Sequence, residues 1–201
     1  MSQSGLFETI EFFTSAADER GLPPSRAEVA FAGRSNAGKS SAINALAQRH
    51  RLAFVSKTPG RTQQINFFSL GAQRYLVDLP GYGYARVPQE KKNEWERFIS
   101  SYLLLRRQLR GLIVVMDIRH PMKEVDRQLL SWYEATGKPA HVLLTKADKL
   151  GRQPAVETLR ATAKTLTADF PGVSVQLFSA EDRIGLEEAE SVLTRWYALD
   201  Q

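Results

Sequence analysis

The stretch Gly33-Arg34-Ser35-Asn36-Ala37-Gly38-Lys39-Ser40 decides the fold, because it fits the phosphate-binding pattern G-x-x-x-x-G-K-[ST] at every fixed position. The glycines let the backbone wrap closely around a phosphate group and direct successive N–H groups at it. Lys39 supplies a positive charge for the β- and γ-phosphates, and the hydroxyl of Ser40 is a ligand for Mg²⁺. The octapeptide therefore predicts a site for a nucleoside triphosphate.

The sequence on either side of this octapeptide supports the same interpretation. Residues 28–32 are typical of a short buried strand, and residues 41–46 are typical of the start of a helix. A helix N-terminus adds a partial positive charge that favours bound phosphate, and Ser41 lies at this start. A chance match in a turn rich in Gly and Ser is the competing interpretation.

Length and composition restrict the class of protein. The 201 residues suffice for one domain, and the absence of Cys excludes a disulfide framework and thiol chemistry. No stretch reaches the roughly 18 consecutive apolar residues of a membrane helix. The first residues lack the basic-then-apolar order of a signal peptide. We expect a cytoplasmic protein, monomeric and without membrane contact.

Apolar segments alternate with amphipathic segments, which is typical of βαβ units. We expect an α/β fold of three layers, with helices on both faces of a mostly parallel six-stranded sheet that has one antiparallel edge strand. The expected strands are 29–32, 65–70, 75–79, 111–117, 140–145 and 173–178, and the expected helices are 38–47, 89–109, 123–136, 154–170 and 186–199. The short link Gly71-Ala72-Gln73 predicts a hairpin between the second and third strands.

The division of the chain follows from the same pattern. Residues 1–25 are expected to form a helix-containing extension that ends at Pro23-Pro24, and residues 26–201 are expected to form a single nucleotide-binding domain.

A second motif ends the strand expected at 75–79. Asp78 can hold Mg²⁺ through water, and the N–H of Gly81 can reach a γ-phosphate. Alone this motif is weak, but after a phosphate loop and a hairpin it is strong. In the loop 49–64, Thr62 is the candidate that contacts Mg²⁺ and the γ-phosphate, and Thr58 is the competing threonine. Such a contact would order the loop in one nucleotide state only.

The run Thr145-Lys146-Ala147-Asp148 predicts recognition of guanine. The Asp148 carboxylate can accept hydrogen bonds from guanine N1–H and from the exocyclic amine, whereas adenine offers no such pair of donors. The usual motif begins with Asn, and the hydroxyl of Thr145 can supply part of the same bracing. Ser179 and Ala180 are small enough for backbone N–H groups to meet guanine O6. An ordinary strand-to-loop Lys and Asp is the alternative.

The motifs GRSNAGKS, TPGRTQ, INFF, DLPGYGYA, TKAD and SA, in this order, resemble the EngB family of ribosome-biogenesis GTPases, also called YihA or YsxC. The family is related to the Era, EngA and TrmE-like GTPases. The resemblance covers about residues 7–198, and DLPGYGYA is far more specific than the phosphate loop. It implies binding of GTP and GDP with Mg²⁺ and a role in assembly of the large ribosomal subunit. The family also carries TKAD, so Thr145 is no departure from it.

The resemblance implies a set of nucleotide contacts. The implied Mg²⁺ ligands are Ser40 and Thr62, together with Asp78. The implied nucleotide-binding residues are Gly33, Arg34, Ser35, Asn36, Ala37, Gly38, Lys39, Ser40, Gly60, Arg61, Thr62, Gln63, Gln64, Asp78, Leu79, Pro80, Gly81, Thr145, Lys146, Ala147, Asp148, Phe178, Ser179 and Ala180, with Ser41 beside them.

Catalysis is expected to be slow, since Tyr82 follows Gly81 where Ras-type GTPases use a water-orienting Gln. The candidate catalytic residues are Lys39, Asn36, Thr62 and Gly81. Asn36 is a candidate for holding K⁺ beside the β- and γ-phosphates, because its loop resembles that of K⁺-activated relatives. A role for Asn36 in capping the turn is the alternative.

Charge is unevenly distributed along the chain. Residues 1–110 carry 16 Lys and Arg against 9 Asp and Glu, whereas residues 111–201 carry 11 against 13. A basic half suggests a polyanionic partner, but on charge alone a solvated surface with a modest bias remains the preferred interpretation. The resemblance makes the partner the rRNA and proteins of the large ribosomal subunit. The candidate contacts are Arg49, Arg51, Lys57, Arg61, Arg86, Lys91 and Lys92. Arg106, Arg107 and Arg110 either join them or complement a helix dipole.

Two other classes of protein remain as alternatives. A small-molecule kinase also uses a phosphate loop, but it needs a lid and an acceptor site. An RNA-binding module with vestigial nucleotide binding would not need Lys39, Ser40, Asp78 and Gly81 intact. The GTPase switch is therefore the preferred interpretation.

Overall fold

The computed structural model of the protein describes residues 6–7, 9–49, 51–53, 64–82 and 89–198, with the backbone alone for 89–96. Its elements, in chain order, are β1 (Glu11–Ala16), the 3₁₀ helix η1 (Glu19–Gly21), β2 (Ala27–Gly33), α1 (Lys39–Leu46), β3 (Ile65–Ser69), β4 (Arg74–Asp78), α2 (Gln89–Leu105), β5 (Leu109–Asp117), α3 (Glu124–Glu134), β6 (Ala140–Thr145), the 3₁₀ helix η2 (Ala147–Lys149), α4 (Arg152–Asp169), β7 (Ser174–Leu177) and α5 (Leu186–Ala198). Among these described elements, no helix is both long enough and apolar enough to cross a bilayer.

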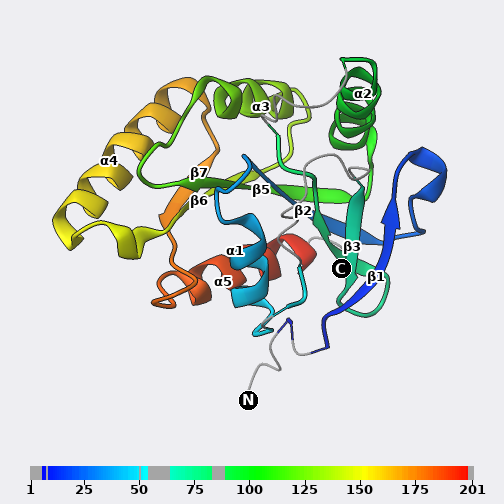
Figure 1. The fold of residues 1–201 in the computed structure, drawn as a ribbon, viewed down its shortest axis with the longest axis horizontal. Coiled ribbons are helices and arrows are strands. Elements are labelled where there is room, and N and C mark those ends of the chain that lie inside the picture. The colour runs from blue at the N-terminus through cyan, green and yellow to red at the C-terminus, as the bar shows by residue number, and fades with distance from the viewer. Residues whose placement is uncertain (1–5, 8, 50, 54–63, 83–88, 199–201) are drawn as a thin grey trace.

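The strands form one sheet in the order β1-β3-β4-β2-β5-β6-β7. From β4 to β7 all neighbours are parallel, whereas β3 runs antiparallel to β4. The predicted fold class and the predicted hairpin are confirmed. In Figure 1, helices α1 and α5 lie on one side of the sheet, and α2 and α3 lie on the other.

The sheet has seven strands in the described part of the chain, not the six that were predicted. The additional strand is β1, which pairs antiparallel with β3 at the edge of the sheet. The expected helix-containing extension over residues 1–25 does contain the 3₁₀ helix η1, but the strand β1 within it was not predicted. Phe12 and Phe13 of β1 pack against Phe68 and Tyr75, which attaches this segment to the domain.

Alternating side chains of the central strands divide the core into two layers. Val29 and Phe31 of β2 belong to the layer that includes α1 and α5, and Ala30 and Ala32 belong to the layer that includes α2, α3 and α4. The middle of a strand covered on both faces is mostly apolar, which explains the continuous apolar runs over residues 29–32 in β2 and 112–116 in β5.

The expected helix 89–109 was too long at its C-terminal end. Helix α2 ends at Leu105, and Leu109 already begins β5 opposite Glu28 of β2. The carbonyl of Gln108 accepts a 2.8 Å hydrogen bond from the N–H of Glu28, so the chain must leave the helix to join the sheet. The amphipathic pattern used to predict the helix did not show that residues near 108 pair with β2 instead of continuing the helix.

Five parallel strands end at the same edge of the sheet. These strands are β2, β4, β5, β6 and β7, and their last residues are Gly33, Asp78, Asp117, Thr145 and Leu177. Ligands of open α/β sheets bind outside the carboxyl ends of parallel strands. The fold therefore gathers most of the predicted site residues at one edge.

Candidate nucleotide-binding site

The phosphate loop connects β2 to α1, as the sequence predicted. Gly38 is the N-cap of α1 and has a φ of 97°, a left-handed conformation that a side chain would strain. Asn36 has a φ of 61°, which Asn tolerates better than most residues. The loop therefore turns sharply enough to aim the first N–H groups of α1 at its own concave side.

Lys39, at the start of α1, forms an ion pair with Asp78 at the end of β4. The side chains of both residues are nearly buried, with exposed fractions of 11% and 8%. Asp78 and Ser40 provide one carboxylate and one hydroxyl, the kind of sparse oxygen set with which Mg²⁺ binds beside substrate phosphates. The residues present thus fit a magnesium–nucleotide complex. The described residues contain no cluster of three or more His, Asp or Glu for a protein-only metal site.

Thr145 braces the phosphate loop against the sheet. Its hydroxyl contacts the carbonyl oxygen of Ala37 and lies 3.0 Å from that of Met116. A single hydroxyl hydrogen serves one of these acceptors at a time. The predicted bracing by Thr145 in place of Asn is confirmed as a contact. It joins the guanine motif at the end of β6 to the middle of the phosphate loop.

Lys146 bridges the same two parts of the site. Its Nζ donates to the carbonyl of Asn36 at 2.7 Å and to Oδ2 of Asp117 at 2.9 Å. Arg119 also donates to both carboxylate oxygens of Asp117. The hydrogen bond from Arg119, followed by that from Lys146, holds the pKa of Asp117 well below its usual range despite the opposing effect of burial. Asp117 is therefore charged and keeps the Lys146 stem in place.

Asp148 lies in the 3₁₀ helix η2 directly after β6. Its Oδ1 accepts a 2.6 Å hydrogen bond from the hydroxyl of Ser179, and its Oδ2 lies 2.8 Å from Nζ of Lys149. These contacts, that from Lys149 first, lower the pKa of Asp148. An ionised carboxylate is the form that accepts from two guanine N–H groups. Lys149 is more than half exposed, so guanine can replace it at Oδ2 at little cost.

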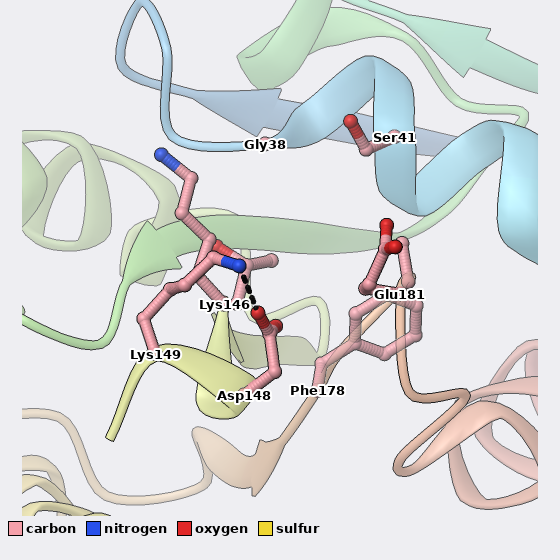
Figure 2. A pocket seen from close by; sticks show the side chains of 9 residues that line it. Gly38, Ser41, Lys146, Asp148, Lys149, Phe178 and Glu181 are labelled. Atoms are coloured by element: carbon pink, nitrogen blue, oxygen red, sulfur yellow. Dashed lines mark ion pairs between the residues drawn. The ribbon is translucent and has the colours of Figure 1, made fainter.

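Several of these residues line a pocket of about 210 Å³ that is open to solvent, shown in Figure 2. The side chain of Asp148 and the ring of Phe178 lie on one side of it, opposite Gly38 and Ser41 of the phosphate loop. The pocket is lined by Gly38, Ser41, Thr145, Lys146, Asp148, Lys149, Phe178, Ala180 and Glu181. The structure thus brings the predicted phosphate and guanine segments together.

The two small residues after β7 differ in what they offer a base. The N–H of Ser179 already donates to the carbonyl of Ile184 at 3.0 Å, and its hydroxyl accepts from the N–H of Asp182. Of the predicted pair, Ala180 lines the pocket and Ser179 does not. Ser179 therefore orients Asp148 and closes its own loop, and Ala180 is the better candidate for guanine O6.

The second predicted phosphate motif packs against the first. The N–H of Leu79 donates to the carbonyl of Phe31, and the N–H of Tyr82 donates to that of Gly33. Pro80 and Gly81 are thereby held along the end of β2. Gln64 is exposed just before β3, whereas Gly60, Arg61, Thr62, Gln63 and the competing Thr58 lie outside the described residues.

The basic residues do not all face outward. Arg106 makes an ion pair with the buried Glu28, with Nη2 2.6 Å from Oε1, so its charge is directed inward and not at a partner surface. Arg49, Arg51 and Arg107 are exposed. For Arg107, exposure agrees both with a contact to a partner and with a role in complementing a helix dipole. Arg110 donates a 3.4 Å hydrogen bond to the carbonyl of Arg26. Lys57, Arg61, Arg86 and the side chains of Lys91 and Lys92 are outside the described part.

Several residues of the site were missed by sequence reasoning. Asp117 and Arg119 fix Lys146, and Lys149 and Glu181 line the pocket. Asp117 carried a usable signal, because a carboxylate at the end of a predicted central strand points to this edge of the sheet. Arg119 and Glu181 carried none, since single charges in loops are usually solvated.

The chain is similar to a known sequence family and to individual full-length relatives. A family described as 50S ribosome-binding GTPase matches residues 28–146. The probable GTP-binding protein EngB of Thiobacillus denitrificans is 58% identical over 98% of this chain and 96% of its own. The corresponding protein of Methylobacillus flagellatus is 57% identical over 95% and 93%.

Solved structures show the same fold. A crystal structure of a probable GTP-binding protein EngB has a TM-score of 0.67 at 20% identity and covers 85% of this chain and 98% of its own. Aquifex aeolicus Era bound to GDP and AlF₄⁻ has a TM-score of 0.65 at 17% identity, covering 84% of this chain and 56% of its own. The pocket at the end of the sheet and the full-length relatives agree: this chain belongs to the EngB family of GTP-binding proteins, among the phosphate-loop GTPases.

Proposed function

We propose that the chain is a switch that binds GTP and GDP with Mg²⁺, hydrolyses GTP slowly, and binds the large ribosomal subunit in one nucleotide state during its assembly. The observation that supports this most is the single pocket that joins Gly38 of the phosphate loop to Asp148 of the guanine motif. The description of the matched family, 50S ribosome-binding GTPase, supports the ribosomal partner. We place the protein in the cytoplasm as a monomer.

Each part of the nucleotide has a residue proposed to hold it. Lys39 leaves Asp78 to bind the β- and γ-phosphates, which frees Asp78 to orient a water on Mg²⁺ beside Ser40. Asp148 accepts from guanine, and the stem of Lys146 lies along the base. Mg²⁺, when bound, neutralises the charge that develops on the phosphates. Thr62 and the segment from Gly60 to Gln64 complete the contacts to the γ-phosphate.

Slow hydrolysis is proposed because Tyr82 does not line the nucleotide pocket and is bonded elsewhere. Its hydroxyl donates to Asp126 of α3, and a phenol whose hydrogen is used there does not orient an attacking water. We propose that K⁺ beside the β- and γ-phosphates, held in part by Asn36, supplies charge in place of an arginine finger. The left-handed φ of Asn36 supports the turn-capping alternative equally, so the test of K⁺ must be direct.

The ribosomal contacts are proposed for the basic residues near the nucleotide. Arg49 and Arg51 are exposed at the end of α1, directly after the phosphate-binding helix. Lys57, Arg61, Arg86, Lys91 and Lys92 belong to the same group in sequence. Phosphate contacts of this kind make binding to RNA strongly dependent on salt concentration.

The function is tested by nucleotide selectivity followed by co-sedimentation. GTP and GDP should displace a fluorescent guanine nucleotide, ATP should not, and Lys39→Ala should abolish binding. Asp148→Asn should weaken guanine nucleotides and improve xanthine nucleotides, which carry an oxygen where guanine carries its amine. The protein should pellet with purified large subunits in the presence of a non-hydrolysable GTP analogue more than with GDP. Equal displacement by ATP would favour a kinase-like protein, and no pelleting in either state would reject the ribosomal partner.

A further inference from the structure

Asp126 is a fully buried carboxylate near the N-terminus of α3, and it receives donors from three segments. Oδ1 accepts from the hydroxyl of Tyr82 at 2.7 Å, and Nε of Arg34 lies 3.1 Å from the same carboxylate. Oδ2 accepts from the N–H of Lys123 at 3.0 Å, which completes a capping box at the start of α3. A buried carboxylate needs such partners, since an unpaired one would be costly.

Two of these segments, those of Tyr82 and Arg34, meet at Gly81. Tyr82 follows it directly, and the backbone of Tyr82 forms a bridge with Arg34 in the phosphate loop. The N–H of Tyr82 donates to the carbonyl of Gly33 at 3.2 Å, and the carbonyl of Tyr82 accepts from Ser35 at 3.3 Å. On the other side of Gly81, the N–H of Leu79 donates to Phe31 at 3.0 Å. Gly81 is thus fixed by backbone contacts on both sides.

The side chain of Tyr82 is what ties this backbone arrangement to α3. Tyr82 packs against the core layer that includes α2, α3 and α4, and it is not among the residues that line the nucleotide pocket. Burial, followed by the charge of Asp126, raises the pKa of Tyr82, so the hydroxyl stays protonated and remains a donor. Arg34 also donates to the carbonyl of His120 at 2.6 Å, which anchors the loop before α3 to the same cluster.

We propose that Tyr82, Asp126 and Arg34 form an anchor that holds Gly81 ready to donate its N–H to the γ-phosphate. Tyr82 and Asp126 are then positioning residues for the GTP-bound state, although neither touches the nucleotide. This inference rests on the proposed function. A donor that is already fixed in place binds without the entropy cost of ordering its segment. GDP lacks the γ-phosphate, so the anchor should affect GTP binding and leave GDP binding unchanged.

Tyr82→Phe is the first test, because it removes one hydroxyl and keeps the ring in place. The affinities of GDP and of a non-hydrolysable GTP analogue are measured by competition with a fluorescent guanine nucleotide. We expect the analogue to bind about tenfold more weakly, as for loss of a hydrogen bond to a charged group, and GDP to change less than about twofold. An unchanged ratio of the two affinities would overturn the proposal, and so would tighter binding of the analogue.

Tyr133→Phe is the matched control. Tyr133 is a buried tyrosine of α3, the helix that carries Asp126, and its hydroxyl has no hydrogen-bond partner among the described residues. It should leave both affinities as in the wild type. A general effect of disturbing α3 would lower the ratio in both variants and would also overturn the proposal. If the wild-type protein bound neither nucleotide, the proposed function itself would fail, which is a different result.

A double-variant cycle distinguishes a role of Asp126 in the anchor from a role only in capping α3. Asp126→Asn keeps the size of the side chain but removes the charge that pairs with Arg34. It should lower the same affinity ratio, and Tyr82→Phe added to it should lower the ratio by less than in the wild-type background, because the two residues act through one contact. Losses that add in full would contradict the anchor. Should Asp126→Asn fail to fold, Tyr82→Phe and its control decide the question alone.

Discussion

Nζ of Lys146 lies 2.9 Å from the carboxylate of Asp117, so the lysine that follows β6 is fixed to the end of β5. The same Nζ donates to the carbonyl of Asn36 at 2.7 Å, which adds the phosphate loop to the pair. Strands β5 and β6 are neighbours in register, with Asp117 opposite Thr145. The sheet therefore builds a rigid link between the guanine side and the phosphate side of the pocket.

Lys146→Met should weaken both GDP and GTP by about tenfold or more, because it removes a charged donor shared by Asp117 and the phosphate loop. The measurement is competition with a fluorescent guanine nucleotide. Lys149→Met is the matched control, since Lys149 pairs with Asp148 from an exposed position. It should change both affinities by less than about threefold. Equal losses in the two variants would show that Lys146 acts only through general charge.

Arg106→Met should destabilise the protein by about 3 to 5 kcal/mol, because it leaves the carboxylate of Glu28 buried without its ion-pair partner. That carboxylate is fully buried and also accepts from the hydroxyl of Tyr102 at 2.7 Å. The neighbouring Arg107→Met should change the free energy of unfolding by no more than about 0.5 kcal/mol, as expected of an exposed residue. Denaturant unfolding of the two variants gives both values. Similar values for the two would contradict the assignment of Arg106 to the core.

The contrast between these two arginines shows what the sequence can and cannot predict. Alternation of apolar and amphipathic segments located the central strands, and fixed motif spacing located Lys39, Asp78 and Asp148. Nothing in the run from Arg106 to Arg110 shows that one arginine turns inward to Glu28, 78 positions earlier. The edge strand β1 was missed for a related reason. Its first residues are exposed, and a bulge between Phe12 and Thr14 interrupts the alternation that identifies a strand.

Stability should fall as the pH is lowered from 7 towards 5.5, because His141 is buried in β6. Its Nε2 lies 2.9 Å from Oε1 of Gln176, whose Nε2 donates to the carbonyl of Gly185. Burial lowers the pKa of His141 despite the opposing hydrogen bond with Gln176, and the charge of Arg195 adds to the lowering. Below an ordinary histidine pKa of about 6.5 the unfolded chain binds more protons than the folded chain, so acid favours unfolding.

The measurement is the free energy of unfolding at several pH values between 5.5 and 7.5. The contribution of one histidine cannot exceed about 1.4 kcal/mol per pH unit. His141→Gln should flatten the slope in this window, and His120→Gln, which alters an exposed histidine, should not. The lowered pKa values of Asp117 and Asp148 act at more acidic pH, since those carboxylates lose their contribution only when protonated. A slope unchanged by His141→Gln would assign the effect elsewhere.

GTP turnover should be faster in KCl than in NaCl at equal ionic strength if K⁺ is held beside the phosphates. Asn36→Ala should remove the difference without abolishing GDP binding, since Lys39 still holds the phosphates. Asn36→Gly keeps the left-handed backbone that the loop needs but also lacks the amide, so it controls for strain. Equal turnover of the wild type in both salts would reject K⁺. A salt difference that survives both substitutions would reject Asn36 as the residue that holds the ion.

Gly111→Ala should destabilise the protein by about 1 to 3 kcal/mol through overpacking. A β-carbon at this position in β5 would lie 2.3 Å from Cε3 of Trp196, in the α5 helix that covers the sheet. The indole ring is buried among neighbours and cannot move away freely. Gly151→Ala is the comparison, since a β-carbon there would lie 3.7 Å from Cδ of Pro154, an ordinary contact. Thermal unfolding should show a clearly larger decrease in Tm for Gly111→Ala.

In a Trp196→Phe background the destabilisation caused by Gly111→Ala should be smaller, because the smaller ring leaves room for the methyl group. A cost that is the same in both backgrounds would mean that the clash with Trp196 is not its cause.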